Sequence, residues 1–316
     1  NVCTHIVDID FNRIKMYVGN YDFWYESSQL IQRLTKAQNK RAEDKIADLQ
    51  NFITRFSANK SKSRQATSRK KLLDKLTVEE MPASSRKYPF VGFTADREPG
   101  KEILEVSELG KTVGNDRLLN NVTFRLGRTD KVCIMSENEL SVTELFKILV
   151  GEHFPDSGSF KWGTTTSFSY FPKDNSDFFD DVDYSLIDWM RQYTQGDDSE
   201  IFIRGFLGRM LFSGDEAFKQ AKVLSGGERV RCMLSRMMLY NSNILILDQP
   251  TNHLDLESIT AVNTGLSDFK GVVIFTSHDH EFISTVANRI IEITPDGARD
   301  YPCSYDEYLN LKKAGR

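Results

Sequence analysis

Two short, largely apolar runs, Ile244–Leu247 and Val272–Thr276, dominate the hydrophobic pattern in the second half of the chain. Runs of this length, bounded by polar residues, are typical of strands buried on both faces of a parallel sheet. The carboxyl ends of such strands form the edge where ligands bind. The pattern therefore predicts that Asp248 and His278, which follow the two runs, lie at a ligand-binding edge.

A helix is predicted from about Glu228 to Tyr240, and the turn before it reads Ser225-Gly226-Gly227. This turn exposes backbone N–H groups at a helix N-terminus, and both features attract phosphate. Taken alone, a Ser-Gly-Gly sequence is more often an ordinary helix cap. The phosphate-binding interpretation therefore depends on the motifs that follow.

Four motifs occur in a fixed order: Leu224–Glu228, the strand ending at Asp248, the stretch Pro250-Thr251-Asn252-His253-Leu254-Asp255, and Thr276–Asp279. They resemble the signature, Walker B, D-loop and switch histidine of an ATP-binding cassette (ABC) domain. The uninterrupted Pro250–Asp255 stretch resembles the ABC-F subfamily, which are soluble cytoplasmic proteins with two cassettes on one chain that act on ribosomes. The resemblance implies an α/β fold of the P-loop NTPase type with a mixed sheet, and ATP and Mg²⁺ as ligands.

The resemblance also implies roles for individual residues. Asp248 and Thr143 would hold Mg²⁺, and His278 would sense the γ-phosphate. In dimers of this family the signature of one cassette faces the Walker motifs of the other. The residues that would cover ATP held by a first cassette are therefore Ser225, Gly226, Gly227 and Glu228. Asp255 would cross to the partner's site, whereas His253 is expected to form a structural hydrogen bond.

The phosphate-binding loop is expected between a strand over Lys131–Met135 and a helix over Thr143–Val150. The intervening residues 136–143 depart from the pattern G-x-x-x-x-G-K-[ST], because serines stand at both glycine positions and Val142 replaces the lysine. Left-handed backbone angles become costly, and the positive charge near the phosphates is lost. Negative charge is added by Glu137, Glu139 and Glu144. Asn138 and Thr143 remain as the loop residues predicted to bind nucleotide.

Gln249 follows the Walker B aspartate, where the family carries a glutamate. Its amide cannot accept a proton from an attacking water, so hydrolysis at this half-site should be crippled. Two explanations stay open: natural decay beside a broken loop, or a laboratory Glu-to-Gln change that traps the ATP-bound dimer. Lys173 falls roughly where cassettes place a glutamine that ligates Mg²⁺. No aromatic residue occurs in Leu104–Gly114, where cassettes often place one to stack on adenine.

The segment Gln29–Leu76 is strongly basic, with thirteen Lys or Arg against four Asp or Glu, in a chain whose net charge is −4. Ile46, Leu49, Ile53 and Phe56 have the spacing of one helical face, and residues 57–61 break it, so two antiparallel helices with a basic tip are expected. Such a charge balance attracts a phosphate backbone, although many charge runs are only solvated helix faces. The segment resembles the ABC-F interdomain linker, which reaches ribosomal RNA and tRNA near the exit site. The phosphate contacts are predicted at Arg64, Arg69, Lys70 and Lys71.

The predicted domain organisation follows from these segments and from an internal repeat. Val286–Ile293, followed by Tyr305–Leu309, resembles Val2–Ile9, followed by Tyr17–Trp24. We therefore expect a two-cassette parent. The expected parts are the tail of a first cassette (residues 1–28), a basic helical linker (29–80), a connector (81–100) and the second cassette (101–316).

With 316 residues, 40% apolar and 27% charged, the chain belongs to the soluble globular class. No apolar stretch approaches the ~20 residues needed to cross a bilayer, and no charged-then-apolar leader is present, so a cytoplasmic location and no membrane domain are expected. The four cysteines show no close pairing, which argues against a zinc site or a disulfide framework.

The sequence is compatible with three functions. The leading hypothesis is an ABC-F translation factor or ribosome-protection factor whose two cassettes clamp ATP. The alternative is a non-catalytic ribosome-binding or RNA-binding scaffold derived from a cassette. The ATPase subunit of a membrane transporter is less favoured, because a basic helical arm has no use there. The sequence leaves open whether the parent confers antibiotic resistance or assists translation.

Overall fold

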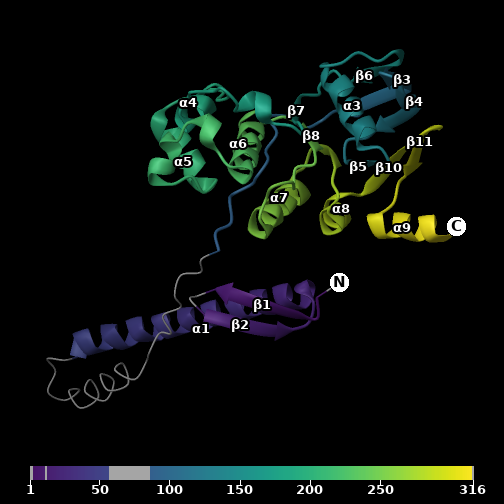
Figure 1. Ribbon diagram of the computed structural model, residues 1–316. Coiled ribbons are helices and arrows are strands. Elements are labelled where there is room, and N and C mark those ends of the chain that lie inside the picture. The colour runs from purple at the N-terminus through teal and green to yellow at the C-terminus, as the bar shows by residue number, and fades with distance from the viewer. Residues whose placement is uncertain (1–2, 11–12, 57–85, 315–316) are drawn as a thin grey trace. The chain divides into compact units, whose positions relative to one another are not determined.

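The structure is a computed structural model that describes residues 3–10, 13–56 and 86–314. The chain divides into two compact units, residues 1–86 and residues 87–316. Figure 1 labels the elements of both units, which are described separately below.

The first unit contains a β-hairpin followed by a long helix. Strand β1 (His5–Asp10) pairs antiparallel with β2 (Arg13–Val18), and helix α1 (Tyr21–Phe56) follows directly. Trp24 is buried, and its indole N–H donates to Asp8, which also pairs with Arg86. The guanidinium of Arg86 lies 4.6 Å from the Trp24 ring centre, an arrangement that favours a cation–π interaction. These contacts fix the start of α1 against the hairpin.

The second unit is built on a mixed six-stranded sheet with a smaller antiparallel sheet beside it. The six-stranded sheet has the order β11-β10-β5-β9-β8-β7, and only the β10–β11 pair is antiparallel. The smaller sheet has the order β4-β3-β6. The strands are β3 (Leu104–Val113), β4 (Asp116–Leu126), β5 (Lys131–Ser136), β6 (Ser157–Trp162), β7 (Phe168–Phe171), β8 (Ile244–Asp248), β9 (Val272–Thr276), β10 (Arg289–Thr294) and β11 (Gly297–Tyr301).

Helices pack on both faces of the six-stranded sheet, and further helices lie beside it. The helices of this unit are α3 (Glu139–Val150), α4 (Leu186–Arg191), α5 (Glu200–Arg209), α6 (Gly226–Leu239), α7 (Leu256–Asp268), α8 (His280–Val286) and α9 (Tyr305–Ala314), with short 3-10 turns at Ser176–Phe178, Gly214–Phe218 and Ala221–Val223. Within this unit, Figure 1 shows α4, α5 and α6 grouped at one end and the small sheet with α3 at the other.

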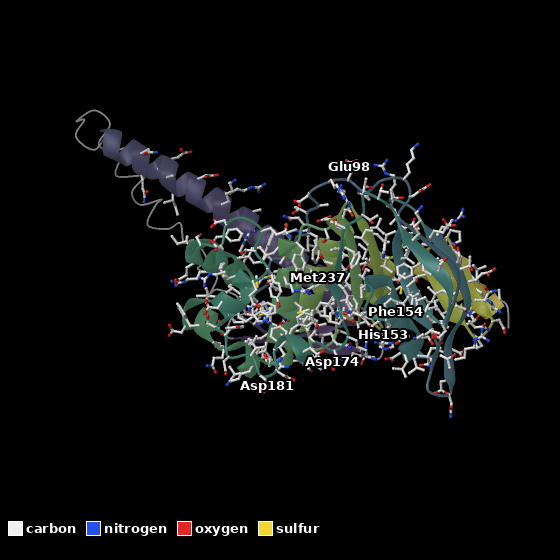
Figure 2. The ribbon with its side chains drawn as sticks, turned by 90° about the horizontal axis from the view of Figure 1, so that it is seen from above. Glu98, His153, Phe154, Asp174, Asp181 and Met237 are labelled. Atoms are coloured by element: carbon white, nitrogen blue, oxygen red, sulfur yellow. The ribbon has the colours of Figure 1, made fainter. Side chains whose placement is uncertain are left out.

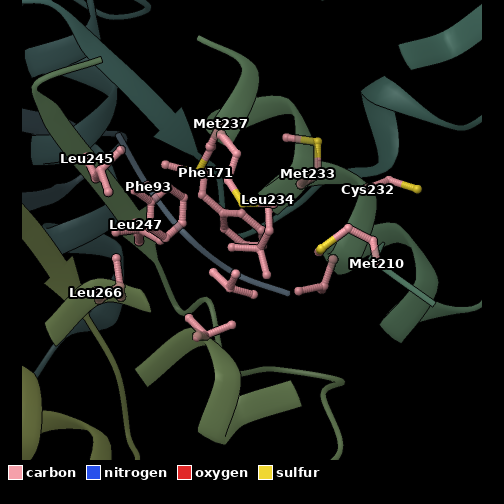
Figure 3. Close-up of a cluster of buried hydrophobic side chains, with 14 of the residues drawn as sticks. Phe93, Phe171, Met210, Cys232, Met233, Leu234, Met237, Leu245, Leu247 and Leu266 are labelled. Carbon is pink, nitrogen blue, oxygen red and sulfur yellow. The ribbon is translucent and has the colours of Figure 1, made fainter. Parts of the chain in front are cut away.

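The alternation of side chains along the central strands creates two cores. In β8, Ile244 and Ile246 pack with α3 and the small sheet, whereas Leu245 and Leu247 pack with the helices on the opposite face. Figure 3 shows Leu245 and Leu247 beside Phe93 in the core on the opposite face. All five residues of β8 are buried, as predicted for a strand covered on both faces.

The structure confirms the predicted α/β cassette fold with a mixed sheet and corrects one element boundary. Helix α1 spans Tyr21–Phe56 and so includes residues 28 and 29, and the domain boundary expected between them stays a prediction. Helix α3 starts at Glu139, four residues before the Thr143 expected from helical spacing. The second linker helix and the basic tip, including Arg64, Arg69, Lys70 and Lys71, lie outside the described residues.

Candidate functional site

The carboxyl edge of the central sheet brings together two residues predicted to hold a metal ion. Asp248 ends β8 and is 1% exposed, and the hydroxyl of Thr143 on α3 donates to its Oδ2 at 2.7 Å. Burial raises the pKa of Asp248, and the Thr143 hydrogen bond works in the opposite direction. A carboxylate and a hydroxyl are oxygen ligands of the kind that Mg²⁺ prefers.

The residues between β5 and α3 form a short turn instead of an open loop. Asn138 caps α3, and its side chain accepts a hydrogen bond from the N–H of Leu140. The expected loop over residues 136–143 is therefore wrong: from Glu139 onward it is the first turn of a helix. Asn138 was predicted to bind nucleotide, but its side-chain oxygen is engaged in this cap. Ser141, at the second glycine position, lies within the helix, where serine is tolerated better than glycine, whereas Ser136 ends β5.

Two further residues of this segment point away from the sheet edge. Val142 is 2% exposed and belongs to the core beneath the small sheet. Glu144, expected to add negative charge beside the phosphates, is largely buried and lies 2.7 Å from the ring of His153. His153 and Phe154 follow α3 and are labelled in Figure 2. The charge of Glu144 is therefore engaged with the turn after the helix.

His278 and Lys173 meet at the same carboxylate. Glu139 Oε1 lies 2.8 Å from His278 Nε2, and Glu139 Oε2 lies 2.5 Å from Lys173 Nζ. The Lys173 hydrogen bond is the main cause that lowers the pKa of Glu139. The sequence did not predict this contact, because Lys173 follows β7, His278 follows β9 and Glu139 is the first residue of α3.

Gln249 occupies a conformation that is unusual for its residue type. Its φ is +55°, in the left-handed region, and it is 3% exposed. Its backbone N–H donates to the carbonyl of Thr276, but its side-chain Oε1 is buried without a partner in the described part of the chain. A buried carbonyl of this kind calls for a donor such as water. The amide can accept a hydrogen bond from that donor but cannot take up its proton.

The signature turn lies at the start of the 14-residue helix α6. Ser225 is the cap of the helix, and it forms a capping box with Glu228. Ser225 and Gly226 are exposed, and the first amide groups of a helix have no acceptor within it. The turn therefore presents open N–H groups, as the phosphate-binding interpretation requires.

The side chain of Glu228 stabilises the conformation of the signature turn. Burial disfavours its charge, but hydrogen bonds from Lys219 and from Ser225 outweigh this effect and lower its pKa to about 2. Lys219 Nζ lies 2.9 Å from Glu228 Oε1, and the backbone N–H of Ser225 donates to Oε2 at 2.8 Å. The carboxylate thus acts on the turn and not on a ligand in this structure.

The loop after β8 packs against the signature turn. A β-carbon added at Gly227 would lie 2.8 Å from the His253 carbonyl oxygen, and one added at Gly226 would lie 3.2 Å from the His253 side chain. His253 was expected to form a structural hydrogen bond, but within the described residues its ring makes this packing contact instead. Asp255 caps α7 by accepting from the N–H of Ser258 at 2.9 Å. Its predicted role toward a partner's site stays a prediction.

A hollow of about 330 Å³ adjoins the turn between β5 and α3. It is lined by Ser136, Asn138 and Ser141 on one side and by residues of β4, β10 and β11 on the other. None of its lining residues is aromatic, which agrees with the lack of an adenine-stacking residue in the sequence. No cluster of three or more metal-ligating side chains occurs among residues 3–10, 13–56 and 86–314.

Comparison with known proteins identifies the family. Two family models described as ABC transporter match the chain, one over residues 7–93 and one over residues 119–252. An uncharacterized ABC transporter ATP-binding protein of Bacillus subtilis, YkpA, is 62% identical over 98% of this chain and 57% of its own length. The probable ATP-binding protein YbiT of Escherichia coli O157:H7 is 42% identical over 98% of this chain and 58% of its own. ABC transporter F family member 2 of Arabidopsis thaliana is 28% identical over the whole chain and 46% of its own length.

Solved structures show the same fold. The ATP-binding subunit of an ABC transporter superposes with a TM-score of 0.56 at 17% identity, covering 66% of this chain and 99% of that one. A dimeric ATP-binding cassette bound to ADP and phosphate superposes with a TM-score of 0.54 at 16% identity, covering 64% of this chain and all of that one. The chain spans somewhat more than half the length of YkpA and YbiT. In the parts that the structure describes, no helix combines the length and the apolar character that a membrane crossing requires. The chain therefore carries an ATP-binding cassette of the ABC family.

Proposed function

We propose that this chain is the second cassette and linker of an ABC-F protein that acts on the ribosome. The signature turn of this cassette covers ATP that is bound by a first cassette. The half-site formed by this chain's own Walker motifs is degenerate. The observation that supports this division most directly is the contrast between the open, glycine-lined turn at Ser225 and the helical turn at Glu139.

The half-site formed by this chain's own Walker motifs fits a metal ion better than a triphosphate. Thr143 and Asp248 lie together and offer oxygen ligands for Mg²⁺. The backbone cradle for the phosphates is replaced by the first turn of α3, and Val142 offers no cation. A bound nucleotide would supply the triphosphate for hydrolysis, but this chain's residues do not form a binding site for the phosphates. Gln249 would orient a water molecule without activating it.

The ribosome as partner is supported by the likeness to F family members and by the basic character of residues 29–76. Within that segment, α1 carries the N-terminal part of the positive charge. A helical arm of this kind would bind RNA through its phosphates, and such binding weakens as salt concentration rises. The location would be the cytoplasm, where ribosomes lie.

Co-sedimentation of the two-cassette parent with ribosomes tests this function. We expect binding to require a non-hydrolysable ATP analogue and to weaken when Arg64, Arg69, Lys70 and Lys71 are neutralised. Each lost phosphate contact should lower the salt dependence of binding by about 0.7 to 0.9 in log–log slope. If the two-cassette parent protein does not co-sediment with ribosomes either with or without the analogue, the proposal is contradicted.

One alternative is favoured by a specific observation. Because the loop before α3 is closed and Val142 is buried, the cassette could serve only as a scaffold for the basic arm. Ribosome binding that depends on salt but is unaffected by ATP analogues would support that second function.

A further inference from the structure

Glu139 places a carboxylate between two side chains that could carry positive charge. Its two oxygens contact Lys173 at 2.5 Å and His278 at 2.8 Å. Lys173 follows β7, His278 follows β9, and Glu139 opens α3, so the contact joins three separate segments at the carboxyl edge of the sheet. It is a product of the tertiary fold and not of local sequence.

The start of α3 explains why Glu139 reaches this position. Asn138 caps the helix, so Glu139 is its first residue, where negative charge is favoured by the helix dipole. A wide phosphate-binding loop at these positions would direct the chain elsewhere. Val142 is buried and supplies no cation that could compete for the carboxylate.

The partners of Glu139 are the two residues whose positions in the sequence resemble ligand-binding positions of a cassette. His278 was expected to sense a terminal phosphate, and Lys173 stands where a metal-binding glutamine was expected. Both donors are engaged by the chain's own carboxylate. An external phosphate could reach them only by displacing Glu139, and it would then lie beside that negative charge.

Glu139 stays in contact with Lys173 and His278 mainly because it belongs to the same chain, and less because the ion pairs themselves are strong. The side chains of Glu139, Lys173 and His278 are 47%, 38% and 66% exposed, and exposed ion pairs are worth about 0 to 1 kcal/mol each. A carboxylate attached to the same chain nevertheless competes at a high effective concentration.

We propose that Lys173 and His278 form an anion pocket whose resident is the carboxylate of Glu139, an internal substitute for a phosphate group. This inference rests on the proposed degenerate half-site and adds the way in which that half-site stays closed without nucleotide. The ligand class of the pocket is a phosphate oxyanion, and removal of the Glu139 charge opens it.

The test is a titration of inorganic phosphate into the 316-residue chain, followed through the imidazole resonances of His278 in ¹H–¹⁵N NMR spectra. In the unaltered chain, phosphate binds weakly, and its dissociation constant is the reference for the variants. In Glu139→Gln, the His278 resonances move before phosphate is added, and phosphate then binds at least about fivefold more tightly, since one opposing charge is gone. The double variant Glu139→Gln, Lys173→Met loses the binding that the single variant gained.

Glu137→Gln is the matched control, because it removes the same charge two residues earlier and Glu137 has no ion pair or hydrogen bond in the described part of the chain. Equal tightening in both variants would overturn the proposal, since net charge alone would then explain the effect. An unchanged His278 spectrum in a folded Glu139→Gln variant would overturn it as well. Neither result would alter ATP-dependent ribosome binding by the parent, so a failure here is separable from a failure of the proposed function.

Discussion

The signature turn and the turn before α3 are both capped helix N-termini, but they differ in the residues that follow the cap. Ser225 caps α6, and two glycines follow it because His253 lies against them. Asn138 caps α3, and an acidic residue follows it. A helix N-terminus therefore becomes an external phosphate site only where its first turn is kept free of side chains. In α3 the chain's own carboxylate points across the sheet edge instead.

The difference between the two turns is sharpened by adding the same charge to each. In the two-cassette parent, Gly226→Asp should lower ATP turnover about 100-fold, because the new carboxylate would face the nucleotide of the partner half-site and disturb its donors. Leu140→Asp adds the same charge in the first turn of α3, where Leu140 is 62% exposed, and should leave turnover nearly unchanged.

Steady-state ATPase assays of the two variants make this comparison. If Leu140→Asp reduced turnover as strongly as Gly226→Asp, the turn before α3 would contribute to a working site. The proposed contrast between a functional signature turn and a degenerate half-site at α3 would then be wrong.

The signature turn should also carry a pH dependence that the other turn lacks. The pKa of Glu228 is lowered from 4.5 to about 2 in the folded chain, so its stabilising effect is present above pH 4.5 and is lost as the pH falls toward 2. Full conversion of this pKa difference would give about 3.4 kcal/mol, and solvent screening of this partly exposed group lowers the expected contribution to about 2 kcal/mol. Urea unfolding between pH 6 and 3 should show a smaller loss of stability in Glu228→Gln than in the unaltered chain.

Glu200→Gln is the control for this titration, because Glu200 is exposed and pairs with the exposed Arg204 at 3.5 Å. This variant should follow the pH profile of the unaltered chain. A Glu228→Gln profile that matches it would show that Glu228 does not hold the turn.

The smallest expected effect concerns the caps themselves. Asn138→Ala should lower the free energy of unfolding by about 1 kcal/mol, and so should Ser225→Ala. Equilibrium urea unfolding at neutral pH measures both. A helix that began at Thr143, as the helical spacing suggested, would make Asn138→Ala neutral, and that result would remove the structural contrast between the two turns.

The sequence predicted the central strands well because burial on both faces leaves a simple apolar signal. Strand β9 has the expected bounds, and β8 differs only by including Asp248. Thr143 and Asp248 were both assigned to a metal site, and the fold brings them within 2.7 Å of each other. Asp248 could be placed because it ends a central strand of the sheet.

The contacts of Glu139 and the start of α3 could not be predicted in the same way. The pattern of apolar residues from Thr143 onward is helical, but the first turn of α3 is fixed by a polar cap at Asn138, which leaves no periodic signal. The meeting of Glu139 with Lys173 and His278 depends on the order of strands in the sheet, and sequence spacing does not encode that order. Likewise, the packing of His253 on the signature glycines appears only once the loop after β8 is folded.

The most direct test of the central claim is a structure of the two-cassette parent closed around a non-hydrolysable ATP analogue with Mg²⁺. We expect a nucleotide covered by the turn at Ser225, Gly226 and Gly227, and no triphosphate at the start of α3, where Glu139 keeps its contacts with Lys173 and His278. An analogue seated against Val142, with Glu139 displaced, would contradict it.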